Sequence, residues 1–200
     1  MNDLANRLAS LHTALLCDAL DAIGHRQQAL GPTIRPIAGG STLVGRAYPL
    51  RCAPTEHVPD APYAQLIEAF DHLDEGHVVV IQTGDQISAM WGELLSTAAR
   101  AAGATGAVMD GLVRDIDDIE SLAFPVFGTG VSPLDSAGRQ DVVEHGRPVR
   151  CGAARVEPGD WIVGDTMGVV AVPTGAADGV VGWAEAKWSG ESAGWRRIER

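Results

Sequence analysis

WGELLSTAARAAGATGAVMDGLVRD, residues 91–115, has the pattern of a helix start, a short helix, a strand and a loop that ends in an Arg-Asp pair. The helix is expected because its apolar positions recur at helical spacing and form one stripe: Leu94, Leu95, Ala98, Ala99 and Ala102. Gly103 stands where such a helix would end. The apolar run 107–109 then predicts a strand, which ends at Asp110-Gly111.

Another strand is expected just before this helix. Residues 78–81, Val-Val-Val-Ile, form a continuous β-branched run that suits a strand buried on both faces. Strand, helix and strand in succession are typical of a βαβ unit, whose two strands run parallel. The helix would descend roughly 16 Å and the second strand would return a similar distance. Gly92-Glu93 and Arg114-Asp115 should therefore meet at the carboxyl edge of the sheet, where α/β proteins commonly bind ligands.

The residues expected at this edge suit an anionic keto acid and a divalent metal. Free amides at a helix N-terminus bind carboxylates. Arg114 can bind a carboxylate or a developing enolate oxygen through two parallel hydrogen bonds. Asp115 is a hard oxygen ligand, and magnesium commonly takes only one or two protein carboxylates. An Arg-Asp pair alone also commonly braces a loop, but its convergence with a helix N-terminus favours a functional site.

Several motifs, in this order, resemble the RraA-like family. They are GELL (92–95), DGxxRDxxD (110–118), PVF (125–127), GVSP (130–133) and VxPGDxxxGDxxGVVxVP (156–173). The resemblance covers roughly residues 10–175, and the ordered set is specific although each motif alone is weak. The family includes 4-hydroxy-4-methyl-2-oxoglutarate/4-carboxy-4-hydroxy-2-oxoadipate aldolases. It also includes a regulator of ribonuclease activity that binds ribonuclease E.

The resemblance implies roles for particular residues. Arg114 would bind the substrate and stabilise its enolate, and Asp115 would be the direct metal ligand. Glu93 and Asp118 would lie nearby and orient water around the metal. Glu185 and Glu191 are the candidates for an acid that a neighbouring subunit's C-terminal region donates. The substrate carboxylate would be bound by backbone amides of Gly92, Glu93, Leu94 and Leu95.

The resemblance also implies an α/β fold of the three-layer β/β/α swivelling-domain type, formed as one domain over residues 1–200. The subunits are expected to form a homotrimer or a dimer of trimers, with active sites in the clefts between subunits. The implied function is that of a class II pyruvate aldolase, dependent on Mg²⁺ or Mn²⁺, which acts on a small 2-keto acid and decarboxylates oxaloacetate as a side activity. The alternatives are a non-catalytic regulator that binds ribonuclease E, and an enzyme of the same scaffold with a different keto or hydroxy acid substrate.

Composition excludes several other classes of protein. The formal net charge of −11 argues against nucleic acid as a partner, because phosphate binding needs clustered Lys and Arg. No apolar run approaches the ~20 residues that span a bilayer, so no membrane partner is expected. Cys17, Cys52 and Cys151 form no CxxC pair, which favours a reducing cytoplasm over a disulfide framework. The sequence has neither an HExxH pair nor a GxSxG elbow.

The rest of the chain predicts further helices and strands. The spacing of Leu4, Leu8, Leu11, Leu15 and Leu20 predicts one amphipathic N-terminal helix that ends near Gly24. Residues 41–52 should form β-structure broken at Gly45 and Pro49. The other expected elements are helices at 63–73, 116–122 and 174–188, strands at 124–127, 161–163 and 169–172, and loops at 53–62 and 132–138.

Overall fold

The computed structural model describes residues 3–58, 61 and 63–198, with side chains described as far as residue 190. Its main feature is a mixed, eight-stranded sheet of order β1-β7-β5-β3-β2-β12-β13, with β9 paired to β2. Strands β2, β3, β5 and β7 are parallel, and the other pairings are antiparallel. The bounds are Arg35–Ala38 (β1), Leu43–Pro54 (β2), His77–Gln82 (β3), Gly106–Met109 (β5), Val126–Gly128 (β7), Gln140–His145 (β9), Trp161–Asp165 (β12) and Gly168–Val172 (β13).

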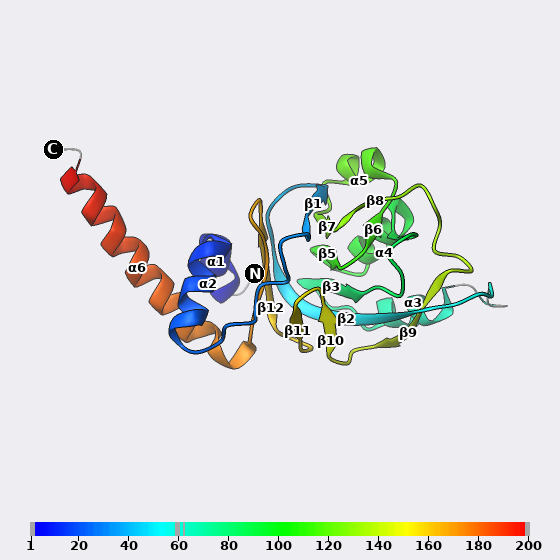
Figure 1. The fold of residues 1–200 in the computed structure, drawn as a ribbon, viewed down its shortest axis with the longest axis horizontal. Helices are drawn as coiled ribbons and strands as arrows, with labels where there is room; N and C mark the ends of the chain where they lie inside the picture. The colour runs from blue at the N-terminus through cyan, green and yellow to red at the C-terminus, as the bar shows by residue number, and fades with distance from the viewer. Residues whose placement is uncertain (1–2, 59–60, 62, 199–200) are drawn as a thin grey trace.

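Three layers form around the parallel part of this sheet (Figure 1). One face packs against helices α3 (Ala64–Asp71), α4 (Glu93–Ala101) and α5 (Ile116–Leu122). Buried side chains of these helices join those of the strands in one core cluster, which includes Leu66, Ala99, Ile119, Ile81 and Met109. The opposite face packs against the hairpin of β10 (Val149–Cys151) and β11 (Ala154–Val156). The expected α/β fold with β/β/α layers is confirmed.

The expected βαβ unit is also confirmed. Strands β3 and β5 are parallel neighbours, with Val78 opposite Gly106 and Ile81 opposite Met109. Helix α4 lies between them in the chain, but the apolar stripe was wrong at one position. Leu94 is 67% exposed, whereas Ser96 and Ala99 are the buried residues of the helix. Leu94 is left on the surface because the helix turns its Ser96–Ala99 side, rather than the Leu94 side, towards the sheet.

A second, three-stranded parallel sheet of order β4-β6-β8 was not predicted. Its strands are β4 (Ala89–Trp91), β6 (Leu112–Val113) and β8 (Gly130–Val131). Each follows a strand of the main sheet, since β4 comes after β3, β6 after β5 and β8 after β7. Two or three residues are too few to produce a recognisable hydrophobic pattern. This small sheet carries the loop ends at which the candidate site lies.

The prediction of one N-terminal helix was wrong. The segment forms two helices, α1 (Asp3–Ala9) and α2 (Thr13–Ala22), separated at residues 10–12. The break is stabilised by Asp165, whose carboxylate accepts hydrogen bonds from the Thr13 amide at 2.9 Å and the Thr13 hydroxyl at 2.8 Å. Both helices still bury their leucines against β12 and β13, so the apolar spacing survives the break.

Strand β2 is continuous, although a break was expected at Gly45 and Pro49. Its partner on one edge changes along its length, from β12 at Leu43–Arg46 to β9 at Leu50–Pro54. Pro49 falls between these two partners, where its missing N–H leaves no ladder hydrogen bond unmade. A Cβ at Gly45 would lie 2.4 Å from the Gly76 carbonyl oxygen, so glycine permits a close approach there.

The other expected helices and strands are present. Helix α5 matches its expected range, and α3, β7, β12 and β13 differ from theirs by one or a few residues. The C-terminal helix α6 (Ala177–Ile198) follows a short 3-10 turn at Thr174–Ala176 and is longer than expected. It packs beside α1 and α2, and its far end projects from the rest of the molecule (Figure 1).

The loop expected at 132–138 lies between β8 and β9, while residues 59, 60 and 62 of the loop expected at 53–62 lie outside the described residues. Cys17, Cys52 and Cys151 are free thiols. None of the helices in the described part of the chain combines the length and the apolar character needed to cross a bilayer.

Candidate active site

The candidate site lies where the three strands of the small sheet end. Hydrogen bonds of the parallel ladder fix the chain there. The Arg114 amide donates to the Trp91 carbonyl at 2.9 Å, and the Ser132 amide donates to the Val113 carbonyl at 3.0 Å. The residues that follow β4, β6 and β8 are therefore neighbours in space although they are far apart in the sequence.

Trp91 anchors the first of these strand ends. Its indole is 1% exposed and stacks on Phe124, with the ring centroids 6.4 Å apart. The indole Nε1 donates to the Ser96 hydroxyl at 2.8 Å, and that hydroxyl donates to the Gly92 carbonyl at 3.0 Å. Burial of a large aromatic ring with its N–H satisfied holds its backbone firmly. The start of α4 is thus fixed relative to the core.

Gly92 allows the Arg-Asp pair to approach this helix start. A Cβ on Gly92 would lie 2.5 Å from Asp115 Oδ2 and 3.2 Å from Arg114 Cγ. The Asp115 Oδ2 atom accepts a hydrogen bond from the Glu93 amide at 3.2 Å. Amides in the first turn of a helix have no intrahelical acceptor, so the N-terminus of α4 presents donors to an anion at this point. The expected proximity of residues 92–93 to 114–115 is observed.

Asp115 has an unusual backbone conformation. Its φ of 58° and ψ of 44° lie in the left-handed region, and it is the N-cap residue directly before α5. A non-glycine residue there costs free energy, although aspartate tolerates it better than most, and such residues are enriched at functional sites. The conformation directs the carboxylate to the start of α4 instead of to its own helix.

Arg114 lies between two carboxylates. Its Nε atom is 3.5 Å from Asp115 Oδ2, and its NH1 atom is 3.2 Å from Asp135 Oδ2. The side chains of Arg114, Asp115 and Asp135 are 36%, 39% and 41% exposed. All three groups are therefore open to a ligand.

The sequence interpretation missed Asp135, because residues 132–138 looked like an ordinary loop. A signal was present. Asp135 follows β8, the third strand whose carboxyl end reaches this edge, just as Arg114 follows β6. The loop is held in place by the Ala89 amide, which donates to the Leu134 carbonyl at 2.8 Å.

The other residues expected at the site differ in whether they contact Arg114 or Asp115. The Glu93 side chain accepts a hydrogen bond from the Thr97 hydroxyl at 2.8 Å, so only its backbone amide contacts Asp115. Leu95 is half-buried, and Asp118 is exposed on the first turn of α5. Glu185 is paired with Arg7 of the same chain at 2.8 Å, and the side chain of Glu191 lies outside those described.

A small cavity opens beside the ion pairs. Its lining includes Leu94, Arg114, Asp115 and Asp135, together with Tyr63 from the start of α3. Among the described residues there is no group of three or more His, Cys, Asp or Glu side chains that could bind a metal together. Among the described residues that line this cavity, the carboxylates are those of Asp115 and Asp135. One or two hard carboxylate ligands fit Mg²⁺ or Mn²⁺ whose remaining positions are taken by water and substrate.

Comparison with known proteins gives consistent matches. A model of the RraA-like family, described as Aldolase/RraA, matches residues 13–171. A Halalkalibacterium halodurans protein named "Putative 4-hydroxy-4-methyl-2-oxoglutarate aldolase" is 29% identical over 98% of this chain and 89% of its own length. Protein DlpA of Legionella pneumophila is 31% identical over 90% of this chain, which spans only 29% of that protein's length.

A solved structure extends the match to the fold. Streptomyces coelicolor RraAS2, described as an unusual member of the RNase ES inhibitor RraA protein family, superposes with a TM-score of 0.88 at 27% identity. The alignment covers 98% of both chains.

Proposed function

Because this chain belongs to the RraA-like family, we propose that it is a divalent-metal-dependent lyase that cleaves 2-keto acids of the 4-hydroxy-4-methyl-2-oxoglutarate type and releases pyruvate. Oxaloacetate decarboxylation is the expected side activity, since it passes through the same pyruvate enolate. The observation that supports this proposal most directly is the convergence on Asp115 of the α4 N-terminus, through the Glu93 amide at 3.2 Å, and of Arg114, through its Nε atom at 3.5 Å.

The residues of this chain bind and orient the substrate. Backbone amides at Gly92, Leu94 and Leu95 receive its C1 carboxylate, beside the Glu93 amide that donates to Asp115 and helped by the dipole of α4. Arg114 donates to the 2-keto oxygen, where negative charge develops as the C3–C4 bond breaks. Asp115 is the group that would bind Mg²⁺ or Mn²⁺, and Asp135 would hold Arg114 beside it. When bound, the metal supplies positive charge that stabilises an enolate.

The cleavage needs no oxidant or reductant. The proton of the C4 hydroxyl passes to an ordered water or to a carboxylate from a neighbouring subunit. The C3–C4 electron pair becomes that of the enolate, and protonation at C3 then gives pyruvate. Glu93 has a supporting part, since its amide donates to Asp115 while its side chain accepts a hydrogen bond from the Thr97 hydroxyl of the same helix.

Substitution of the central pair tests the proposal. In a lactate-dehydrogenase-coupled pyruvate assay, Arg114→Ala and Asp115→Ala should each lower kcat/KM by about a hundredfold or more, because each removes charge that acts in the transition state. Asp117→Ala, an exposed neighbour on α5, is the matched control and should keep near-normal rates. EDTA should stop pyruvate formation and added Mg²⁺ should restore it. Near-normal rates in either variant of the pair would refute the assignment.

We also propose that the active unit is a homotrimer or a dimer of trimers, in the cytoplasm. Its support is a set of exposed apolar side chains near the site, Ile87, Leu94, Val131 and Leu134, which a neighbouring subunit would cover. The three free thiols suit a reducing compartment. Light scattering of the purified protein tests the assembly.

A second candidate function is regulation of a ribonuclease by protein contact. It is supported by the likeness to RraAS2 of the RNase ES inhibitor family and by the acidic surface implied by a net charge of −11. Capture of ribonuclease E by a preparation that releases no pyruvate from any keto acid would favour this function over the lyase.

A further inference from the structure

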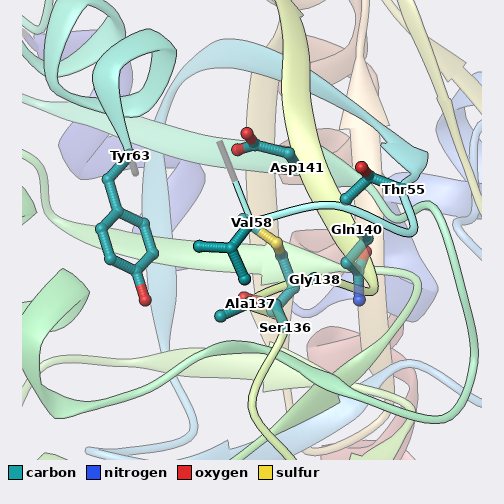
Figure 2. A pocket seen from close by; sticks show the side chains of 9 residues that line it. Thr55, Val58, Tyr63, Ser136, Ala137, Gly138, Gln140 and Asp141 are labelled. Carbon is teal, nitrogen blue, oxygen red and sulfur yellow. The ribbon is translucent and has the colours of Figure 1, made fainter. Parts of the chain in front are cut away.

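A second pocket adjoins the cavity at Arg114. It lies between the chain after β2, the start of α3 and the loop before β9, with Val58 in its lining (Figure 2). Tyr63, Met90 and Ser136 line both spaces, so they stand where the two meet. A substrate bound at Arg114 can therefore extend as far as Tyr63 and Ser136.

The polar side chains around the Arg114 cavity fall into two groups. Arg114 and the two aspartates described above pair with one another, and the Trp91 indole donates its hydrogen bond within the core. The hydroxyls of Tyr63 and Ser136 form the second group, since neither has a hydrogen-bond partner in the part of the chain that the structure describes. These two hydroxyls are the uncommitted hydrogen-bond donors that a substrate would meet there.

Ser136 is a buried residue with an unsatisfied hydroxyl. It is only 6% exposed. Its loop is held by its carbonyl, which accepts hydrogen bonds from the amides of Arg139 at 2.8 Å and Gln140 at 3.0 Å. A buried hydroxyl without a partner costs free energy, and a ligand that supplies an acceptor removes that cost. The loop thus presents a donor that a bound substrate can satisfy.

Tyr63 has a strained backbone directly before α3. Its φ of 64° and ψ of 10° lie in the left-handed region. A bulky residue is rare there, and such strain is concentrated at functional sites. The ring is half-buried against the core on the helix side of the sheet, which fixes its direction. Figure 2 shows the ring extending from the start of α3, with the hydroxyl at the end farthest from the backbone.

The charges around the two spaces admit a second carboxylate on the substrate. Among the described residues that line them, the acidic ones are Asp115, Asp135 and Asp141. Arg114 and the divalent cation that Asp115 would hold offset these three carboxylates. A dianionic substrate therefore meets no net negative charge, and its distal carboxylate needs only hydrogen-bond donors.

We propose, on the basis of the lyase function above, that the hydroxyls of Tyr63 and Ser136 bind the C5 carboxylate of substrates of the 4-hydroxy-4-methyl-2-oxoglutarate type. Each hydroxyl donates one hydrogen bond to this group, which takes no part in the breaking of the C3–C4 bond. The two residues are therefore specificity determinants for the end of the substrate that does not react. Oxaloacetate ends at C4 and has no atom to make these contacts.

Two variants with two substrates test this assignment. In Tyr63→Phe and Ser136→Ala, kcat/KM for 4-hydroxy-4-methyl-2-oxoglutarate should fall about tenfold or more, mainly through a higher KM, because each variant loses a hydrogen bond to a charged group. Oxaloacetate decarboxylation by the same variants should change less than about twofold. The melting temperature should be unchanged or higher, since neither hydroxyl has a partner in the free protein.

Tyr48→Phe is the matched control. It removes the chain's other tyrosine hydroxyl, which contacts His145 at 2.9 Å outside both linings, and it should leave the ratio of the two kcat/KM values unchanged. Equal losses on both substrates, or no loss on either, in Tyr63→Phe and Ser136→Ala would overturn the proposed contacts and leave the lyase function standing. Absence of pyruvate from both substrates with the wild-type protein would overturn the lyase function and this proposal with it.

Discussion

Arg114 shows why the ion pairs at the site are better understood as positioning contacts than as stabilising ones. Each member is more than a third exposed, and pairs at that exposure contribute little to folding. Their geometry is nevertheless restrictive, because the two carboxylates contact different nitrogens of one planar guanidinium. Arg114 is thereby held with its side chain across the cavity before any ligand arrives.

Asp135→Asn tests this role. The substitution keeps the shape but removes the charge that fixes one end of the guanidinium. We expect kcat/KM to fall about tenfold, which corresponds to ~1.4 kcal/mol, with little change in the melting temperature. Asp135→Glu should recover part of the loss, because it restores the charge. A drop in stability that matches the drop in rate would instead indicate a structural role.

Gly92→Ala tests the close approach at the start of α4. The added methyl group would lie 2.5 Å from Asp115 Oδ2, so the carboxylate must move away from the Glu93 amide. We expect a loss of activity of about tenfold or more, since misplacement by an ångström is costly in an active site. Gly182→Ala is the matched control, because nothing lies within 4 Å of its Cβ, and it should leave the rate unchanged. Wild-type activity in Gly92→Ala would contradict the expected displacement of Asp115.

At the scale of elements, the sequence predicted those formed by local patterns. Three elements have hydrophobic patterns long enough to be identified: the run 78–81, the helix that begins at Glu93 and the strand at 106–109. The parallel pairing of the two strands follows from the strand-helix-strand order. The proximity of Arg114-Asp115 to Gly92-Glu93 followed from the same order. These predictions required no contact outside the βαβ unit.

The elements that were missed depend on distant partners. Helix α2 begins at Thr13 because Asp165, more than 150 positions away, accepts its amide and hydroxyl. Strand β2 passes Pro49 unbroken because its antiparallel partner changes there. Asp135 joins the site because Ala89 holds its loop. None of these partners could be identified from the local sequence, which is why the corresponding predictions failed or were not made.

Thr13→Val tests the link between α2 and the β12–β13 turn. The variant keeps the volume of the side chain but removes a hydroxyl that donates to a carboxylate. We expect the free energy of unfolding to fall by ~1.5–3 kcal/mol in urea denaturation, the range for a hydrogen bond to a charged group. Ser10→Ala removes an exposed hydroxyl nearby and should change stability by less than about 0.5 kcal/mol. Equal effects of the two variants would argue against a special role for Asp165.

At the scale of the whole molecule, the reactivity of the three thiols depends on how tightly the layers are packed. Burial raises the pKa of Cys52 to about 12 and that of Cys151 well above its usual value, and it raises the pKa of the half-buried Cys17 as well. A raised pKa leaves less thiolate, which is the reactive form. With Ellman's reagent at pH 8, Cys17 should react slowly and the other two thiols only after unfolding in guanidinium. Rapid reaction of two thiols in the native protein would show that the core opens readily.

The chain passes from the main sheet to the small sheet three times, and this arrangement affects how new substrate specificities could arise. Three connections join the two sheets: residues 83–88, Asp110-Gly111 and Thr129. An insertion or deletion in one of these connections would shift the residues at one strand end of the small sheet relative to the site. The strands of the main sheet would keep their register. Relatives with different substrates should therefore vary more in the lengths of these connections than in the lengths of the strands that they connect.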